Sequence, residues 1–145
     1  MQDITAWFRT VPIFSDSDPA VIHDFESISS DFEFTRPQIK DCADPYVVFD
    51  EVTYMPGGFA GSKPYWEAIV ESSREKEPGT LSYDILKDLR EEEIVATFEV
   101  YESEEYARDV HAQSGPVRDK VENTTHLRAG LKHHVLKKIA GFLDR

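Results

Sequence analysis

The order of apolar segments after residue 45 constrains the fold more than any other feature of this sequence. Tyr46–Tyr54 is rich in Val, Phe, Thr and Tyr and stops at Met55-Pro-Gly-Gly58, which indicates a strand followed by a turn. Thr80–Leu86 alternates apolar and polar residues, as a half-buried strand does. Ile94–Tyr101 is also strand-like, and a last strand is expected within Leu131–Leu143.

A first helix is expected between the first two of these strands. Ser62 can cap its start, because a serine hydroxyl accepts a hydrogen bond from an unpaired N–H of the first turn. Glu77-Pro-Gly79 is expected to end it. One face of this helix carries the residues predicted to face the core: Trp66, Ile69, Val70 and Ser73.

A second helix is expected between the third and fourth strands. Ser103 can cap it, and the glutamates that follow favour the positive end of the helix dipole. Gly115-Pro116 is expected to break or kink the segment. The apolar stripe of this helix is predicted to consist of Tyr106, Val110, Val117 and Val121.

The resulting order, β-α-β-β-α-β, predicts an α+β fold of the ferredoxin-like, split βαβ type. Two helices would cover one face of a four-stranded antiparallel sheet, and a second copy of the chain is the commonest cover for the other face. We therefore expect a homodimer with the sheets face to face. Residues 46–145 form this domain, and residues 1–45 are an N-terminal extension in which Ala20–Ile28 is expected to be a short amphipathic helix.

The overall charge limits the partners. The 145 residues carry 28 acidic and 16 basic side chains, a net charge of −12, so neither nucleic acid nor an anionic membrane is an expected partner. No apolar run approaches the length of a membrane span, and the start of the chain does not resemble a secretory signal, so a cytoplasmic location is expected. The single cysteine, Cys42, has no second cysteine with which to form a disulfide.

Three short motifs in this frame resemble those of antibiotic biosynthesis monooxygenase domains. Glu77-Pro-Gly-Thr-Leu-Ser-Tyr83 resembles the E-P-G-x-x-x-Y turn that opens the second strand of such domains. Glu99-Val-Tyr101 resembles the E-x-Y/W that closes their third strand, and His111-Ala-Gln-Ser114 resembles the H-x-x-S of their second helix. Order and spacing agree over roughly residues 46–143.

The ending Ile139-Ala-Gly-Phe-Leu143 resembles fungal members of this family. Many of those carry a second, degenerate copy of the module before the recognisable one. On this resemblance, residues 1–45 would be the remnant of such a copy.

The resemblance implies a dimeric α/β barrel with a pocket between each sheet and its own helices, and chemistry without metal or flavin. Typical members oxygenate electron-rich polycyclic phenols, anthrones or quinols of the kind found in polyketide secondary metabolism. Such a substrate can itself donate an electron to O2 after losing a proton, so the protein supplies a dry cavity, a base and hydrogen-bond donors. The expected partners are therefore a small aromatic substrate and O2, with no cofactor.

Related haem-degrading members of the superfamily differ at two positions. They place an iron-binding histidine where this sequence has Val121, and they usually have tryptophan at the position of His111. A haem role is therefore not expected.

His111 is the predicted base, because it matches the helix histidine of the family and an unperturbed imidazole titrates near neutrality. Trp66 and Tyr83 are predicted to shape and polarise the pocket. Further predicted substrate-binding residues are Tyr65, Glu99, Tyr101 and His134. Glu99 would either orient His111 or another donor, or hydrogen-bond the Gly79 turn. A purely structural role stays open for each of these side chains.

His133 and His134 are neighbours in the expected last strand, so they point to opposite faces and cannot chelate one ion together. No metal site is expected.

Two further classes of function stay open. The same fold hosts isomerases, cyclases and decarboxylases, in which His111 would move protons through an enol without oxygen. The third class is a non-catalytic module that binds a small aromatic ligand. In that case the pocket would be filled with Phe and Leu side chains, and His111 would be turned to solvent.

Overall fold

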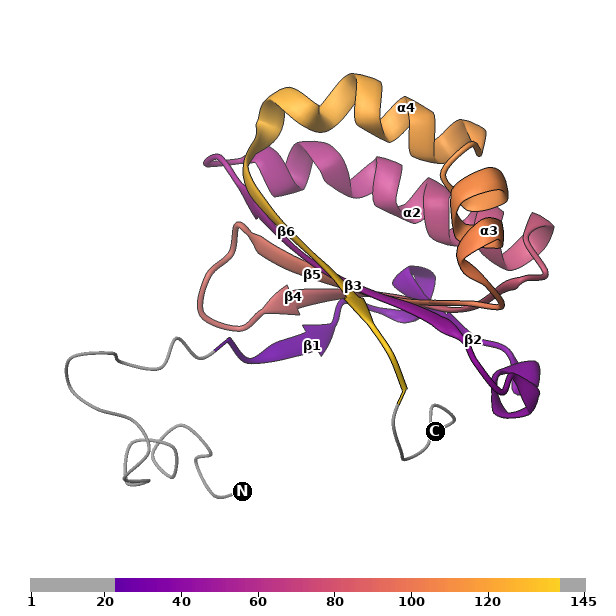
Figure 1. The fold of residues 1–145 in the computed structure, drawn as a ribbon. Helices are drawn as coiled ribbons and strands as arrows, with labels where there is room; N and C mark the ends of the chain where they lie inside the picture. Colours follow the sequence, from indigo (N-terminus) through magenta and orange to yellow (C-terminus); the bar gives the residue numbers. More distant parts are fainter. Residues whose placement is uncertain (1–22, 139–145) are drawn as a thin grey trace, which may run out of the picture.

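The computed structural model of the chain describes residues 23–138 (Figure 1). Four strands form the predicted antiparallel sheet in the order β4-β5-β3-β6: β3 (Tyr46–Tyr54), β4 (Thr80–Asp88), β5 (Ile94–Tyr101) and β6 (Arg128–Leu136). Three helices lie on one face of this sheet: α2 (Gly58–Lys76), α3 (Glu104–Tyr106) and α4 (Gly115–Thr124). The predicted α+β, ferredoxin-like fold is therefore confirmed. Residues 139–143, in which fungal similarity and the end of the last strand were predicted, lie outside the described residues.

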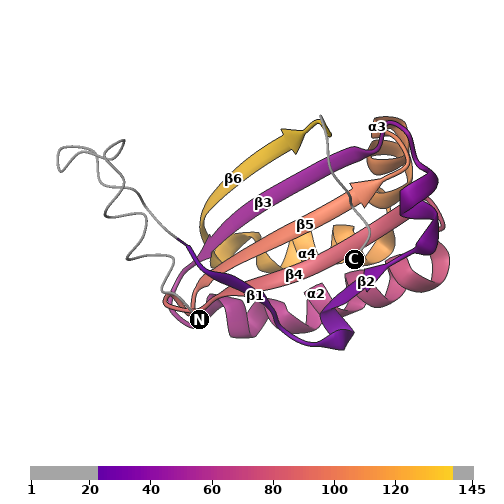
Figure 2. The ribbon, with the colours of Figure 1, turned by 90° about the horizontal axis from the view of Figure 1, so that it is seen from below.

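The N-terminal segment extends the sheet. Two short strands, β1 (Phe25–Ser27) and β2 (Glu33–Thr35), pair antiparallel with β4 along its free edge (Figure 2). The predicted helix over Ala20–Ile28 is therefore wrong over the residues that the structure describes. A helix of this length is marginal by itself, whereas the edge of β4 offers unpaired backbone groups.

The face of the sheet opposite the helices, here called the outer face, is covered at one end. The 3₁₀ turn η2 (Pro37–Asp41) lays Ile39 over Val47, Leu81 and Val100, and Ile39 is only 1% exposed. The expectation of a wholly bare outer face is therefore met only in part.

α2 begins four residues before the predicted cap, Ser62. Gly57 has a φ of 77°, a left-handed conformation that glycine adopts without strain, and it turns the chain from β3 into α2. The Glu93 carboxylate accepts hydrogen bonds from the N–H groups of Gly57 and Phe59, so a residue between β4 and β5 caps the helix. Ser62 lies inside the helix and is buried. The buried face of α2 is as predicted: Trp66, Ile69, Val70 and Ser73.

The second helical stretch comprises α3, a π-helical turn over Ala107–His111, and α4. The cap is confirmed, because Ser103 Oγ accepts the N–H of Tyr106 at 3.1 Å, and so is the break before Gly115. The predicted apolar stripe is wrong in part, because Val110 and Val121 are 41% and 50% exposed. The π turn, closed by the bond from Ala112 N to Ala107 O, shifts the helical phase. The side chains that this stretch buries are polar: His111, Lys120 and Thr124.

No helix among residues 23–138 is long and apolar enough to cross a membrane.

Candidate active site

A hollow of about 310 Å³ opens between the sheet and the second helical stretch. Its walls come from β3, β5, β6 and the residues around the π-helical turn. The lining residues are Tyr46, Val48, Asp50, Glu99, Tyr101, Glu104, Ala107, Arg108, His111, Ala112 and His133.

His111 is 7% exposed and lies in the wall of this hollow, with its Nδ1 2.8 Å from Oε2 of Glu77. Burial raises the pKa of Glu77, but the hydrogen bond and charge of His111, with the Thr80 hydroxyl, outweigh burial and hold that pKa below its usual value. Glu77 therefore stays ionised and can only accept hydrogen bonds. This places the His111 proton on Nδ1 and leaves the lone pair on Nε2, the arrangement that a general base needs.

The turn before β4 brings Glu77 to this position. A Cβ atom at Gly79 would lie 2.5 Å from the ring of Tyr106, so only glycine allows the turn to pack this closely against α3. The register of β4 with β5 shifts after Thr80, which leaves Leu81 on the outer face. Thr80 and Tyr83 consequently both face the helices.

Two tyrosines flank the imidazole. The ring centroids of Tyr83 and Tyr101 lie 5.4 and 5.1 Å from that of His111, and both rings are almost fully buried. Burial, followed by the negative charge of Glu99, raises the pKa of both phenols well above its usual value. Both phenols therefore remain protonated, so they can donate hydrogen bonds but cannot act as bases.

Glu99 is 8% exposed and accepts two hydrogen bonds, from Thr97 Oγ1 at 2.7 Å and from the Tyr101 hydroxyl at 2.6 Å. It bonds neither His111 nor the Gly79 turn, two of the partners predicted for it. It holds the Tyr101 phenol instead. The carboxylate at His111 belongs to Glu77, which sequence reasoning placed in a motif but did not assign to the site.

Two predicted residues on α2 do not line the hollow. Trp66 is buried in the core, and its indole N–H donates to the Tyr54 hydroxyl at 2.8 Å, so this donor is already occupied. Tyr65 is half-buried on the same helix and is also absent from the lining.

Lys120 is a buried residue that sequence reasoning missed. It is 6% exposed, and its Nζ lies 3.6 Å from the centroid of the Trp66 ring. Within residues 23–138 its ammonium has this cation–π contact but no hydrogen bond or ion pair. Burial, with the charge of Arg128, lowers the pKa of Lys120 to about 8, although the carboxylates of Glu99 and Asp50 act in the opposite direction.

The last strand places His133 at the hollow in place of the predicted His134. His133 pairs with Asp50 across β3, and its Nδ1 lies 2.6 Å from the Asp50 carboxylate. His134 points to the outer face, where its ring centroid is 6.4 Å from that of Phe49. The prediction that His134 lines the pocket is therefore wrong, because strand register and not composition decides which neighbour faces inward.

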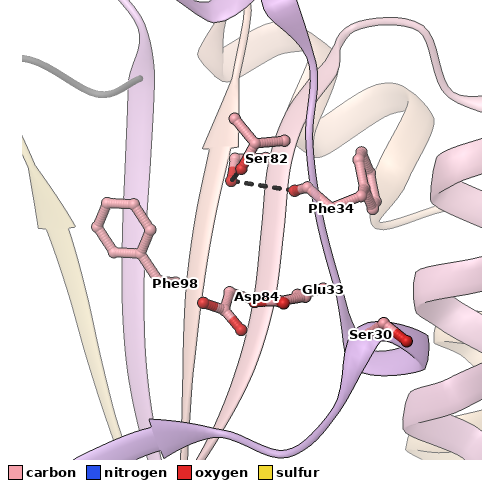
Figure 3. Close-up of a pocket in the computed structure, with 7 residues that line it drawn as sticks. Ser30, Glu33, Phe34, Ser82, Asp84 and Phe98 are labelled. Atoms are coloured by element: carbon pink, nitrogen blue, oxygen red, sulfur yellow. Dashed lines mark hydrogen bonds between the residues drawn. The ribbon is translucent and has the colours of Figure 1, made fainter. Parts of the chain in front are cut away.

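A second hollow, of about 320 Å³, lies on the outer face beside β2 (Figure 3). Glu33 and Asp84 pair across β2 and β4 there, and the Ser82 hydroxyl donates to the Phe34 carbonyl at 3.2 Å. The described residues that line it include no histidine or lysine. Among residues 23–138, no group of three or more His, Cys, Asp or Glu side chains could hold a metal ion. The first hollow is the candidate active site because its wall carries the buried imidazole of His111.

The sequence model of the antibiotic biosynthesis monooxygenase family matches residues 45–123, more than half of the chain. The chain belongs to this family. No functionally curated protein matches it significantly.

Solved structures of family members and similar proteins share the fold. A protein of Bacteroides thetaiotaomicron assigned to the antibiotic biosynthesis monooxygenases is 17% identical, with a TM-score of 0.67 over 72% of this chain and 98% of that chain. A protein of Pseudomonas aeruginosa is 21% identical, with a TM-score of 0.62 over 68% and 98%. A protein of Lactobacillus acidophilus assigned as a monooxygenase is 14% identical, with a TM-score of 0.63; the match covers 71% of this chain and 47% of that longer one.

Proposed function

We propose that this protein is a cofactor-independent monooxygenase that oxidises an electron-rich aromatic phenol, anthrone or quinol of the polyketide type. The buried Glu77–His111 pair carries the proposal, because it supplies a base of defined tautomer at the wall of a hollow. Membership of the family and the two protonated phenols beside the imidazole support it.

In the proposed reaction, Nε2 of His111 removes a proton from the substrate, and Glu77 stabilises the imidazolium that forms. The resulting phenolate or carbanion is electron-rich enough to donate an electron to O2. The ammonium of Lys120, which lies close enough to Glu99 and Asp50 of the lining to feel their charge, supplies positive potential for the oxyanion that develops, while the phenols of Tyr83 and Tyr101 flank the imidazole.

The atoms and electrons balance without an external reductant. The methylene carbon of an anthrone loses two hydrogens and gains one oxygen atom from O2, and the second oxygen atom leaves as water. The four electrons that reduce O2 come from the substrate, which becomes a quinone.

Oxygen uptake by metal-free protein with dithranol, a dihydroxyanthrone, tests the proposal. We expect saturable consumption above the uncatalysed autoxidation rate and a loss of about 10²- to 10⁴-fold in His111→Ala. His126→Ala, at an exposed position outside the hollow, is the matched control and should keep the rate. No consumption over a panel of anthrones and quinols, or an undiminished rate in His111→Ala, would overturn the proposal.

The same pair also supports an isomerase, cyclase or decarboxylase that acts through an enol, because proton transfer by an imidazole–carboxylate pair needs no oxygen. Turnover that continues at the same rate under argon would select this second function. A module that only binds ligand is less well supported, because the described residues that line the hollow include no Phe or Leu and His111 is buried in the wall.

We also propose that the outer face forms a homodimer. The rings of Phe25, Phe49 and His134 form a row there, with neighbouring centroids 6.2 and 6.4 Å apart, and Leu136 is 45% exposed. Size-exclusion chromatography with light scattering should return twice the 16.6 kDa of one chain. A strict monomer at micromolar concentration would contradict the dimer.

A further inference from the structure

Arg36 joins the N-terminal segment to the turn that carries Glu77. Its guanidinium donates to four backbone carbonyls: those of Thr80 (Nε, 2.8 Å), Ser73 (Nη2, 3.0 Å), Arg74 (Nη2, 2.7 Å) and Glu77 (Nη2, 3.2 Å). α2 ends among these residues. The Ser73 carbonyl also accepts the N–H of Glu77 at 3.2 Å, whereas the Arg74 carbonyl lies in the last turn, where carbonyls lack N–H partners within the helix. A cation at this end also complements the negative end of the helix dipole. Arg36 thus ties the end of α2 to the start of β4.

Three of these four residues also supply the polar side chains around Nδ1 of His111. Glu77 Oε2 lies 2.8 Å from Nδ1, and Ser73 Oγ lies 3.5 Å from it. The Thr80 hydroxyl donates to the same Oε2 at 2.8 Å. The backbone that Arg36 holds is therefore the backbone that sets the surroundings of the imidazole.

Arg36 is itself held in place. Its backbone N–H donates to the Leu81 carbonyl at 2.7 Å, and its guanidinium lies 5.2 Å from the centroid of the Phe34 ring. Pro37 follows it and restricts its backbone to the extended conformation observed, with φ −88° and ψ 141°. The side chain therefore reaches the turn from a defined position.

We propose that Arg36 is a positioning residue for the active site: it holds the turn so that Glu77 stays in hydrogen-bond distance of His111 and keeps the proton on Nδ1. The inference rests on the proposed function of the Glu77–His111 pair. It assigns a role in the site to a segment that precedes the family match at residue 45.

NMR of the full chain, with ¹⁵N-labelled histidine and ¹³C-labelled glutamate, tests this in Arg36→Met. In the wild type we expect the neutral His111 ring to be a single Nδ1–H tautomer. In Arg36→Met we expect a mixture of tautomers and a Glu77 pKa that moves up toward its usual value, because the bonds that lower it are loosened. Arg36→Lys should recover little, since an ammonium cannot match the planar fork that reaches four carbonyls.

Arg74→Met is the matched control. Its guanidinium also ties α2 to the N-terminal segment, through the carbonyls of Ser30 and Glu33 at 3.0 Å each and the Phe34 ring at 5.9 Å, but these bonds go to none of Ser73, Glu77 and Thr80. Both variants should lower the melting temperature, while Arg36→Met alone should change the His111 ring signals and lower kcat about tenfold to hundredfold.

Unchanged ring signals and an unchanged Glu77 pKa in Arg36→Met would overturn the inference and leave Arg36 a purely structural cap. Equal changes in both arginine variants would overturn it too. The NMR readout needs no substrate, so a failure of the proposed oxygenase chemistry is distinguishable from a failure of the positioning role.

Discussion

The two helical stretches over the sheet differ in the large side chains that they bury. α2 buries Trp66, Ile69 and Val70 against the strands, as a core helix does. The stretch from Glu104 to Thr124 exposes two of its valines and buries His111, Lys120 and Thr124. Burying polar groups costs free energy unless they are satisfied, and Lys120 lacks a hydrogen bond or ion pair among residues 23–138, so stability alone does not explain this buried stripe. The first helix holds the fold, and the second carries the chemistry that we propose.

The polar stripe is also satisfied unevenly. His111 has Glu77 as a partner at 2.8 Å, and the Thr124 hydroxyl donates to the Lys120 carbonyl at 2.8 Å. Among the described residues, the Lys120 ammonium has a cation–π contact with the Trp66 ring but no hydrogen bond or ion pair. A substitution at Lys120 should therefore change the proposed activity without lowering the stability of the fold.

The largest effect on stability is expected from a substitution in the apolar buried face of α2. Ile69→Ala removes a 2%-exposed side chain from the core and should lower the free energy of unfolding by about 2–5 kcal/mol. The activity per folded molecule should stay close to that of the wild type. Urea unfolding measures the stability, and active-site titration measures the activity per folded molecule. A large loss of activity in the folded protein would show that Ile69 of α2 contributes to the reaction as well as to the fold.

Glu77→Gln tests the polar site around His111. Glutamine keeps the size of the side chain but removes the charge that assigns the proton to Nδ1, so we expect a loss of about 10²-fold in kcat. The lowered pKa of Glu77 adds stability that is present above the usual glutamate value of 4.5 and is lost as the pH falls through the folded value.

Unfolding experiments over the acid range should therefore show a shallower pH dependence in Glu77→Gln than in the wild type. Thr53→Ala, on β3 but outside the lining of the hollow, is a suitable control for both readouts. A glutamine variant with full activity would mean that the carboxylate has no part in the reaction.

The fold was predictable where the pattern is local. The strands Tyr46–Tyr54 and Ile94–Tyr101 have the predicted bounds, because their residue types favour a half-buried strand by themselves. Phe25–Ser27 and Glu33–Thr35 were not predictable, since strands of three residues exist here only because the edge of β4 pairs with them. The start of α2 was missed because its cap, Glu93, is distant in sequence.

The site was predictable only as far as its motifs reach. His111 was found, but its partner Glu77 is 34 residues away, and only the folded turn brings the two together. Lys120 was missed because the π-helical turn shifts the phase of the stretch, so a stripe read from the valines points the wrong way. The signal that could have found it is the spacing of Val117, Lys120 and Thr124, which share one helical face.

The smallest effect on activity is expected at Lys120, where a substitution should leave the stability of the fold intact. If its ammonium stabilises the developing oxyanion, kcat/KM should fall above pH 8, where the buried amine loses its proton. Lys120→Met should lower kcat/KM about tenfold near neutral pH and abolish this alkaline limb. Lys120→Arg should keep a cation through the whole range and remove the limb without removing activity.

Stability provides the control, because the lowered pKa of Lys120 makes a prediction that needs no substrate. Between pH 8 and 10.5 the unfolded chain still binds a proton that the native lysine has released, so this group makes the free energy of unfolding rise with pH. Lys120→Met should lack that rise and should be at least as stable as the wild type at neutral pH, since methionine avoids the cost of burying a charge. If Lys120→Met were destabilised as much as Ile69→Ala, both helical stretches would serve packing. The contrast between a packing helix and a catalytic one would then be wrong.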